Sequence, residues 1–200
     1  MSATVLLVRH AAHVDLNLRL SGRRAGVALS DAGRAQAAAL GRRLAGRGVT
    51  RVECSPLERT RDTAAAIADA CGLPAPVPVE ALIEIDMGDW TGRAFDGFGD
   101  DPAWHAWNAE RGTARIPGGE SMGEAQARIV AHLSTAAAGE TVAMVTHSDM
   151  IRAAVAHVIA LPLDNLLLFD IDPASVTGVA IGDWGAKLLW LNETVGVADG

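Results

Sequence analysis

Two pairs of chemically active residues follow short apolar runs in this chain. Arg9-His10 comes directly after VLLV at 5–8, and His147-Ser148 comes directly after TVAMVT at 141–146. Runs of this length are typical of buried strands. If the two strands are neighbours in a parallel sheet, their carboxyl ends meet at the edge where open α/β sheets place their ligands. The two histidines would then lie side by side in a crevice.

A third junction, CSPLERT at 54–60, offers Arg59 in the first turn of a predicted helix. The crevice would then hold two imidazoles and two guanidiniums, which repel one another unless an anion lies between them. Guanidinium forks match phosphate oxygens, and a helix N-terminus adds N–H donors. The residues therefore predict a site for phosphate or sulfate.

The elements that must position these residues alternate between strand and helix. Ser30 is a predicted N-cap, Ser55-Pro56 a second helix start, and Ser121 with Glu124 a capping box. Trp104 and Trp107 could share one helix face, with Trp90 packing separately. Predicted helices cover 31 to about 46, 57–70, 103–110, 121–138 and 148–159; predicted strands cover 5–8, 49–54, 141–146, 166–171, 175–181 and 187–191.

This order of elements predicts an α/β fold: a three-layer α/β/α sandwich with a mostly parallel central sheet and an antiparallel edge. The antiparallel part comes from the strands after residue 166, around turns at Asp172-Pro173 and 182–185. No linker or internal repeat divides the chain. We therefore expect one catalytic domain over 1–194 and a loose tail at 195–200.

Composition excludes several classes of protein. The 200 residues carry a formal net charge of −7, which argues against general nucleic-acid binding. Residues 1–62 hold 11 basic and 5 acidic residues, whereas 63–200 hold 6 basic and 19 acidic ones, so a local basic site on an acidic protein is expected. No apolar run is long enough for a membrane span or a signal segment, and we expect a cytoplasmic protein. Cys54 and Cys71 form no disulfide or metal pattern.

Six stretches of the chain resemble the histidine phosphatase superfamily, in the branch that includes cofactor-dependent phosphoglycerate mutase. They occur in that family's order and span residues 4 to about 160. The stretches are LVRHA at 7–11, LSDAGRAQA at 29–37, CSPLERTRDTA at 54–64, LIEIDMGDWTG at 82–92, PGGES at 117–121 and VTHSDMIR at 145–152.

The resemblance implies a role for each central residue. His10 would be the nucleophile that forms a phosphohistidine, with its second ring nitrogen fixed by a hydrogen bond. Glu84 would protonate the leaving oxygen, and its apolar neighbours would raise the pKa of its carboxyl for that task. No metal or other cofactor is needed in this scheme. The three non-bridging oxygens would be held by Arg9, Arg59 and His147.

The chain departs from the family pattern just after the nucleophile. Ala11 replaces the usual glycine, Ala12-His13 replaces Glu-Thr, and Asn17 lies one position later than the usual asparagine. His13 could contact the substrate, support a residue that does so, or lie on the surface. The candidate substrate-binding residues are Asn17, Gly22, Arg23 (or Arg24), Glu120 and Ser148, the last through its backbone N–H.

The segment from Glu84 to Gly118 is short and acidic, whereas mutases of this family usually carry a longer closing insertion there. We therefore expect a phosphatase that acts on a small phosphorylated substrate, with phosphoglycerate mutase activity as the alternative. Two further alternatives are a metal-dependent hydrolase, for which no HxH or HExxH spacing is present, and a non-catalytic phospholigand-binding regulatory domain. No nucleic acid or membrane is expected as a partner, and a homodimer is allowed.

Overall fold

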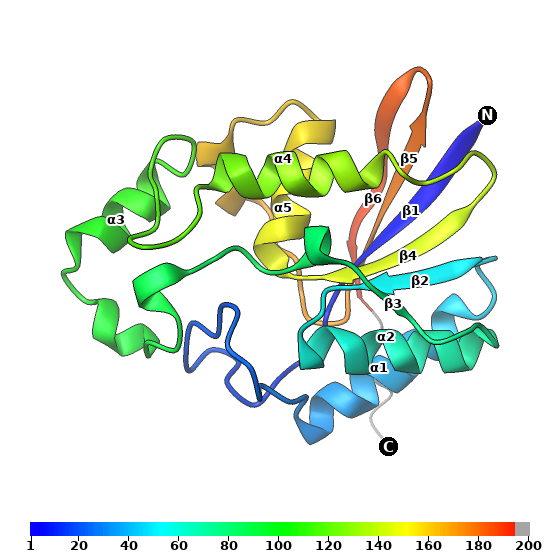
Figure 1. Ribbon diagram of the computed structural model, residues 1–200, viewed down its shortest axis with the longest axis horizontal. Helices are drawn as coiled ribbons and strands as arrows, with labels where there is room; N and C mark the ends of the chain where they lie inside the picture. Colours follow the sequence, from blue (N-terminus) through cyan, green and yellow to red (C-terminus); the bar gives the residue numbers. More distant parts are fainter. Residues whose placement is uncertain (195–200) are drawn as a thin grey trace.

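A six-stranded mixed sheet forms the centre of the computed structural model, which describes residues 1–194 (Figure 1). The strand order is β3-β2-β4-β1-β5-β6. β1 runs parallel to β4, and β5 and β6 form the antiparallel edge. The strands are β1 (Ser2–Arg9), β2 (Arg51–Cys54), β3 (Val77–Pro78), β4 (Thr141–Thr146), β5 (Val176–Gly182) and β6 (Gly185–Glu193).

Helices cover both faces of this sheet. On one face, α1 (Asp31–Leu44) and α2 (Glu58–Cys71) pack against Leu6 and Val8; on the other, α4 (Met122–Leu133) and α5 (Ser148–Val158) pack against Val5 and Leu7. Alternate residues of β1 thus point into two separate cores, as the two-residue period of a strand requires. The three-layer α/β/α prediction is confirmed.

Two predicted helix starts are confirmed and one is wrong. The Ser30 hydroxyl accepts the N–H of Gly33, and Ser121 with Glu124 forms a complete capping box. Ser55, by contrast, does not cap α2, whose N-cap is Leu57. The Ser55 side chain is fully buried and lies beside His147 instead. Ser55 therefore contacts a predicted site residue instead of capping α2.

The predicted strand at 166–171 is also wrong. A 3₁₀ helix, η4 (Leu163–Leu168), occupies the first half of this stretch, and no strand follows it there. Leu166 is fully buried, whereas Leu167 and Leu168 are exposed. A run of leucines with one buried member fits a short helix packed on α5 better than an alternating strand.

The segment from 80 to 121 extends beyond the carboxyl ends of the parallel strands (Figure 1). It contains η1 (Glu80–Leu82), η2 (Gly88–Trp90), η3 (Phe95–Phe98) and α3 (Pro102–Ala109). Trp90 packs edge-on against Trp104 and Trp107, at centroid distances of 5.4 and 6.4 Å. The prediction that Trp90 packs separately is therefore wrong.

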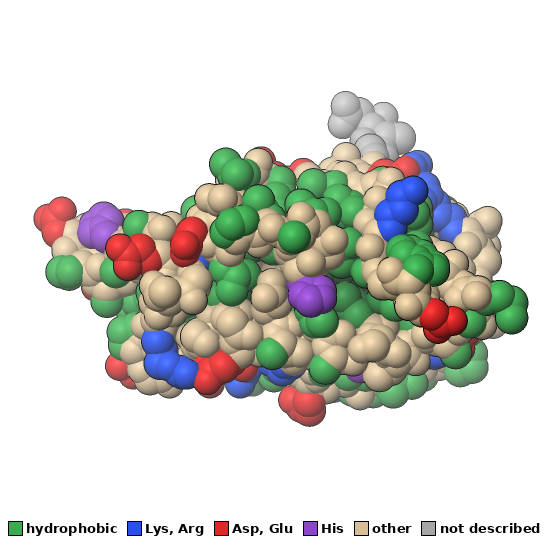
Figure 2. Space-filling model, turned by 90° about the horizontal axis from the view of Figure 1, so that it is seen from above, with side chains coloured by type: hydrophobic (Ala, Val, Ile, Leu, Met, Phe, Trp, Pro, Cys, Tyr) green, Lys and Arg blue, Asp and Glu red, His purple; other side chains and the backbone are tan. Residues whose placement is uncertain are grey.

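The described part of the face seen from above carries no large patch of one charge (Figure 2). Figure 2 shows charged side chains of both signs scattered among polar and apolar ones on the face seen from above. Within residues 1–194, no helix is both long and apolar enough to cross a bilayer.

Candidate active site

The register of the two central strands brings the two predicted histidines together. Arg9 pairs with Thr146, so each histidine is the first residue beyond its strand. The backbone N–H of His10 still donates to the carbonyl of Thr146 at 3.0 Å. The rings of His10 and His147 meet edge-on, with centroids 5.2 Å apart. This proximity was predicted from the sequence, and it places two imidazoles at the carboxyl edge of the sheet.

His10 has the tautomer that a nucleophile needs. Its Nδ1 lies 2.8 Å from the carbonyl oxygen of Ala11, which can only accept, so Nδ1 carries the proton and Nε2 keeps its lone pair. Burial, followed by the charge of Arg59, lowers the pKa of His10 well below its ordinary value. The imidazole is therefore neutral at neutral pH.

Arg9 and Arg59 surround this ring with N–H donors. Each is anchored to a backbone carbonyl: Arg9 Nη1 donates to Ile171 at 2.6 Å and Arg59 Nη2 to Gly22 at 2.7 Å. Among residues 1–194, Nε of both arginines and Nη1 of Arg59 are buried without a hydrogen-bond partner. Since buried donors are almost always paired, these nitrogens are suited to an oxyanion.

His147 lies behind His10 and is fully buried. Its Nε2 contacts the Ser55 hydroxyl at 2.9 Å, and its Nδ1 lies 3.4 Å from Arg59 Nη2 and 3.6 Å from Glu84 Oε2. Because a guanidinium can only donate, Nδ1 is the acceptor and Nε2 carries the proton. Its ring is not part of the cavity wall formed by the described residues.

Glu84 reaches the site from the segment after η1. Its Oε1 accepts the N–H of Ile85 at 3.0 Å. Burial, followed by the nearby charge of Asp149, raises the pKa of its carboxyl to about 7. A carboxyl with this pKa can give and take a proton near neutral pH. Its rival Asp86 instead pairs with Arg23.

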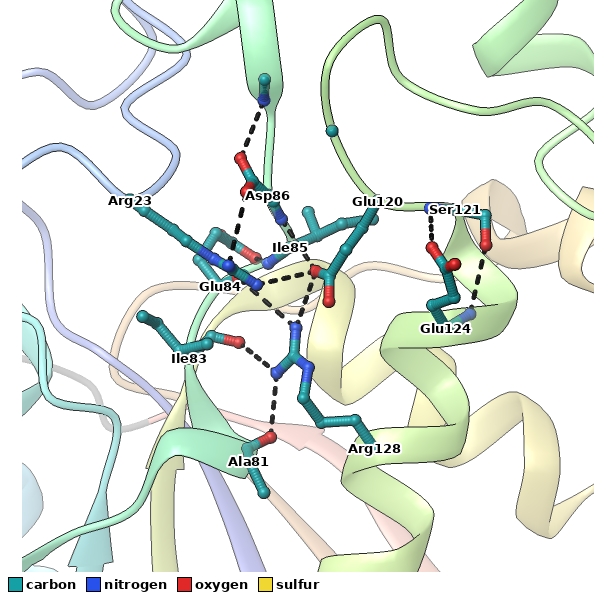
Figure 3. Close-up of polar contacts among 12 residues, drawn as sticks. Arg23, Ala81, Ile83, Glu84, Ile85, Asp86, Glu120, Ser121, Glu124 and Arg128 are labelled. Carbon is teal, nitrogen blue, oxygen red and sulfur yellow. Dashed lines mark hydrogen bonds and ion pairs between the residues drawn. The ribbon is translucent and has the colours of Figure 1, made fainter.

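A cavity of about 370 Å³ opens over these groups. Of the predicted residues, Arg9, His10 and Arg59 line it together with Glu84, and so do three candidate substrate-binding residues: Asn17, Gly22 and Ser148. Arg23 and Glu120 are not among the described residues that line it, and their contact with substrate stays a prediction. They pair with each other at 2.8 Å, beside the main chain of Glu84 (Figure 3).

His13 contributes a further ring to the cavity wall. It is 8% exposed, and its centroid lies 5.3 Å from that of His10. Its Nδ1 accepts the N–H of Asp15 at 3.2 Å, so its Nε2 carries the proton. Burial, followed by Arg59, lowers the pKa of His13 to about 4. His13 is thus a neutral donor in the place where the sequence departs from the pattern that it resembles.

The outer part of the cavity holds residues that the sequence reasoning did not single out. Asp149 forms ion pairs with Arg111 at 3.1 Å and with Arg152 at 3.5 Å, and all three line the cavity with Phe95, Trp104 and Trp107. Asp149 and Arg152 lie in the matched stretch VTHSDMIR, which could have indicated them. No local pattern marks Arg111.

In the described part of the chain, residues 1–194, no group of three or more His, Cys, Asp or Glu side chains gathers in a way that could hold a metal ion. The sequence likewise carried no local metal-ligand spacing.

Comparisons with known proteins agree with this geometry. A model of the histidine phosphatase superfamily (branch 1) matches residues 5–194. A probable phosphoglycerate mutase GpmB from Yersinia pestis (strain Pestoides F) is 33% identical over 165 residues, which cover 79% of this chain and 75% of the relative. A mycobacterial glucosyl-3-phosphoglycerate phosphatase superposes with a TM-score of 0.83 at 28% identity, over 97% of this chain and 100% of the other. YhfR from Bacillus stearothermophilus superposes with a TM-score of 0.88 at 26% identity, over 98% and 99%.

Proposed function

Because the chain belongs to branch 1 of the histidine phosphatase superfamily, we propose that it hydrolyses phosphomonoesters through a phosphohistidine formed on His10. Its relatives are named as phosphatases and mutases, and the chain is an enzyme of this superfamily. One observation carries the proposal. His10, neutral and with Nε2 unprotonated, lines a cavity together with Arg9 and Arg59, whose buried donors have no hydrogen-bond partner among residues 1–194.

In the first half-reaction, the Nε2 lone pair of His10 attacks phosphorus and the bond to the ester oxygen breaks. Arg9 and Arg59 hold non-bridging oxygens, which is the main catalytic contribution that a protein can make to phosphoryl transfer. The protonated carboxyl of Glu84 gives its proton to the departing oxygen, and the product leaves as an alcohol.

In the second half-reaction, the Glu84 carboxylate takes a proton from water. The resulting hydroxide attacks phosphorus, the N–P bond breaks, and its electron pair returns to Nε2 of His10. Inorganic phosphate leaves, and Glu84 is protonated again for the next cycle. A carboxyl pKa near the working pH suits both directions of transfer.

His147 completes the phosphate site in this proposal. Its Nδ1 faces the side where Arg59 and Glu84 meet. Because its ring is not part of the cavity wall formed by residues 1–194, His147 acts on the phosphate through Arg59, whose Nη2 lies 3.4 Å from Nδ1. The N-terminus of α5 at Ser148 adds the positive end of a helix dipole to the same site.

The substrate is a small phosphorylated molecule whose leaving group occupies the outer cavity. Arg111 and Arg152 share the carboxylate of Asp149, and Arg152 also pairs with Asp170, so the charges of these four groups cancel. Aromatic rings form much of the rest of this wall. Phosphoglycerate mutase activity is the second candidate, favoured by the name of the relative at 33% identity. It uses the same phosphohistidine and returns the phosphoryl group to an organic hydroxyl before water reacts.

The test compares two substrates in wild type, His10→Ala and Glu84→Gln. p-Nitrophenyl phosphate has a leaving group that needs no proton, whereas β-glycerophosphate needs one. We expect Glu84→Gln to lower kcat/KM for β-glycerophosphate by roughly 10²–10⁴-fold. With p-nitrophenyl phosphate it should release about one equivalent of nitrophenol in a burst, then stall as acid-labile phosphoprotein. His10→Ala should abolish both reactions.

His157→Ala, which changes an exposed histidine of α5, is the matched control and should behave like wild type. Full phosphatase activity in His10→Ala would refute the proposal. Faster turnover of 3-phosphoglycerate by mutase chemistry than by hydrolysis would replace the phosphatase with the second candidate.

A further inference from the structure

Two arginines outside the cavity hold the main chain that carries Glu84. Arg128 Nη1, from α4, donates to the carbonyls of Ala81 and Ile83 at 3.0 and 2.7 Å. Arg23 Nε, from the loop before α1, donates to the carbonyl of Glu84 itself at 2.8 Å. No described strand pairs with residues 81–86, so the two side chains supply hydrogen bonds that a sheet would otherwise give.

Glu120 joins these two arginines. Its Oε2 accepts from Arg23 Nη2 at 2.8 Å, from Arg128 Nη2 at 2.9 Å and from the backbone N–H of Asp86 at 2.9 Å. Figure 3 shows dashed contacts from the Glu120 carboxylate to both guanidiniums, with the Glu84 segment beside them. We call Arg23, Glu120 and Arg128 the Glu120 cluster. One carboxylate oxygen thus fixes both ends of the segment that bears the acid.

The Glu120 cluster also sets the charge beside the main chain of Glu84. Glu120 and Asp86 together balance Arg23 and Arg128. The charged or titratable groups around the Glu84 carboxyl are His147, which precedes α5, Asp149 of α5, Arg59 of α2 and Arg9 of β1. Loss of the Glu120 charge would leave one net positive charge beside this segment, because Asp86 remains, and would favour the ionised form of the acid.

We propose that Glu120 is a positioning residue for the proton transfer by Glu84: it locks Arg23 and Arg128 onto the Glu84 backbone and neutralises them. The two arginines therefore hold the acid in place without forming an ion pair with its carboxyl. This inference rests on the proposed role of Glu84 in the phosphatase reaction. It also replaces the predicted substrate contacts of Arg23 and Glu120 with a contact inside the protein.

The test uses kcat/KM, which reports the step that releases the leaving group, for the same two substrates. Glu120→Gln should lower the value for β-glycerophosphate by roughly tenfold or more and that for p-nitrophenyl phosphate much less, because only the first needs a placed proton. The alkaline limb of the β-glycerophosphate pH profile should move to lower pH. Glu120→Asp keeps the charge but shortens the reach, so it should lower kcat/KM and leave the limb in place.

Glu124→Gln is the matched control, because Glu124 lies four residues further on, pairs with Arg115 at the surface and can keep its capping box as glutamine. Wild-type values are expected for it.

Equal losses of kcat/KM for both substrates in Glu120→Gln, or an alkaline limb that does not move, would overturn the proposal. If Glu120→Gln does not fold, the test uses Glu120→Asp and compares the losses of kcat/KM for the two substrates. Equal losses for both substrates would reject the positioning role of Glu120. Unchanged β-glycerophosphate turnover in Glu84→Gln would instead refute the proposed function itself.

Discussion

Glu84→Gln should stabilise the folded protein at neutral pH while it removes the acid. The wild-type carboxyl is 14% exposed, and burial raises its pKa from about 4.5 to about 7. The unfolded chain therefore loses this proton more readily than the folded one. Between pH 4.5 and 7, ionisation favours the unfolded state and reduces wild-type stability.

The size of this effect follows from the two pKa values. Each unit of difference corresponds to about 1.4 kcal/mol, so the wild type is destabilised by about 3 kcal/mol at pH 7 and by almost nothing at pH 4. Glutamine stays neutral at both pH values and can still accept the Ile85 N–H through its amide oxygen. The variant should therefore be the more stable protein by up to about 3 kcal/mol at pH 7.

Urea unfolding of both proteins at pH 4, 5, 6, 7 and 8, followed by tryptophan fluorescence, measures the difference. The gain should grow with pH up to about 7 and then level off. Glu80→Gln, at an exposed carboxylate four residues earlier, should show no such trend. A gain that is independent of pH, or a variant less stable than wild type at pH 7, would refute the buried-acid explanation.

Two further predictions concern the segment after the nucleophile. His13→Ala should weaken competitive inhibition by inorganic phosphate about fivefold, the value of one neutral hydrogen bond, and this factor should stay constant from pH 5.5 to 8 because burial holds the pKa of His13 at about 4. A factor that disappears above pH 6.5 would show that a charged imidazole is responsible. Gly33→Ala should cost roughly 1–3 kcal/mol in thermal or urea unfolding, because its Cβ would lie 1.8 Å from the carbonyl oxygen of Ala12. Gly46→Ala, with nothing within 4 Å, is the control, and a Gly33→Ala variant as stable as this control would contradict the close approach.

The sequence was sufficient to predict the centre of the site because local signals and topology agree there. Apolar runs end at Arg9 and Thr146, and a parallel pairing of two buried strands leaves their histidines little freedom of position. The tautomer of His10 also follows from chain geometry, since the acceptor for Nδ1 is the carbonyl of the next residue.

Polar partners that meet only through tertiary contacts were not predictable in this way. Ser55 has every local mark of an N-cap, yet a neighbouring strand brings His147 within 2.9 Å of its hydroxyl. Arg23 and Glu120 are 97 residues apart, and only the folded chain shows that they bind each other and the backbone of Glu84. Charge type alone does not distinguish a substrate contact from an internal ion pair.

The aromatic cluster of Trp90, Phe98 and Trp107 has an evolutionary consequence. These rings are almost fully buried against one another within a single stretch of chain, which also supplies Phe95 and Trp104 to the outer wall of the cavity. The phosphate-binding residues Arg9, His10 and Arg59 come from β1, the residue after it and α2. Mutations can therefore reshape the wall that contacts the leaving group while the catalytic centre stays intact, so new substrate preferences can arise without loss of the chemistry.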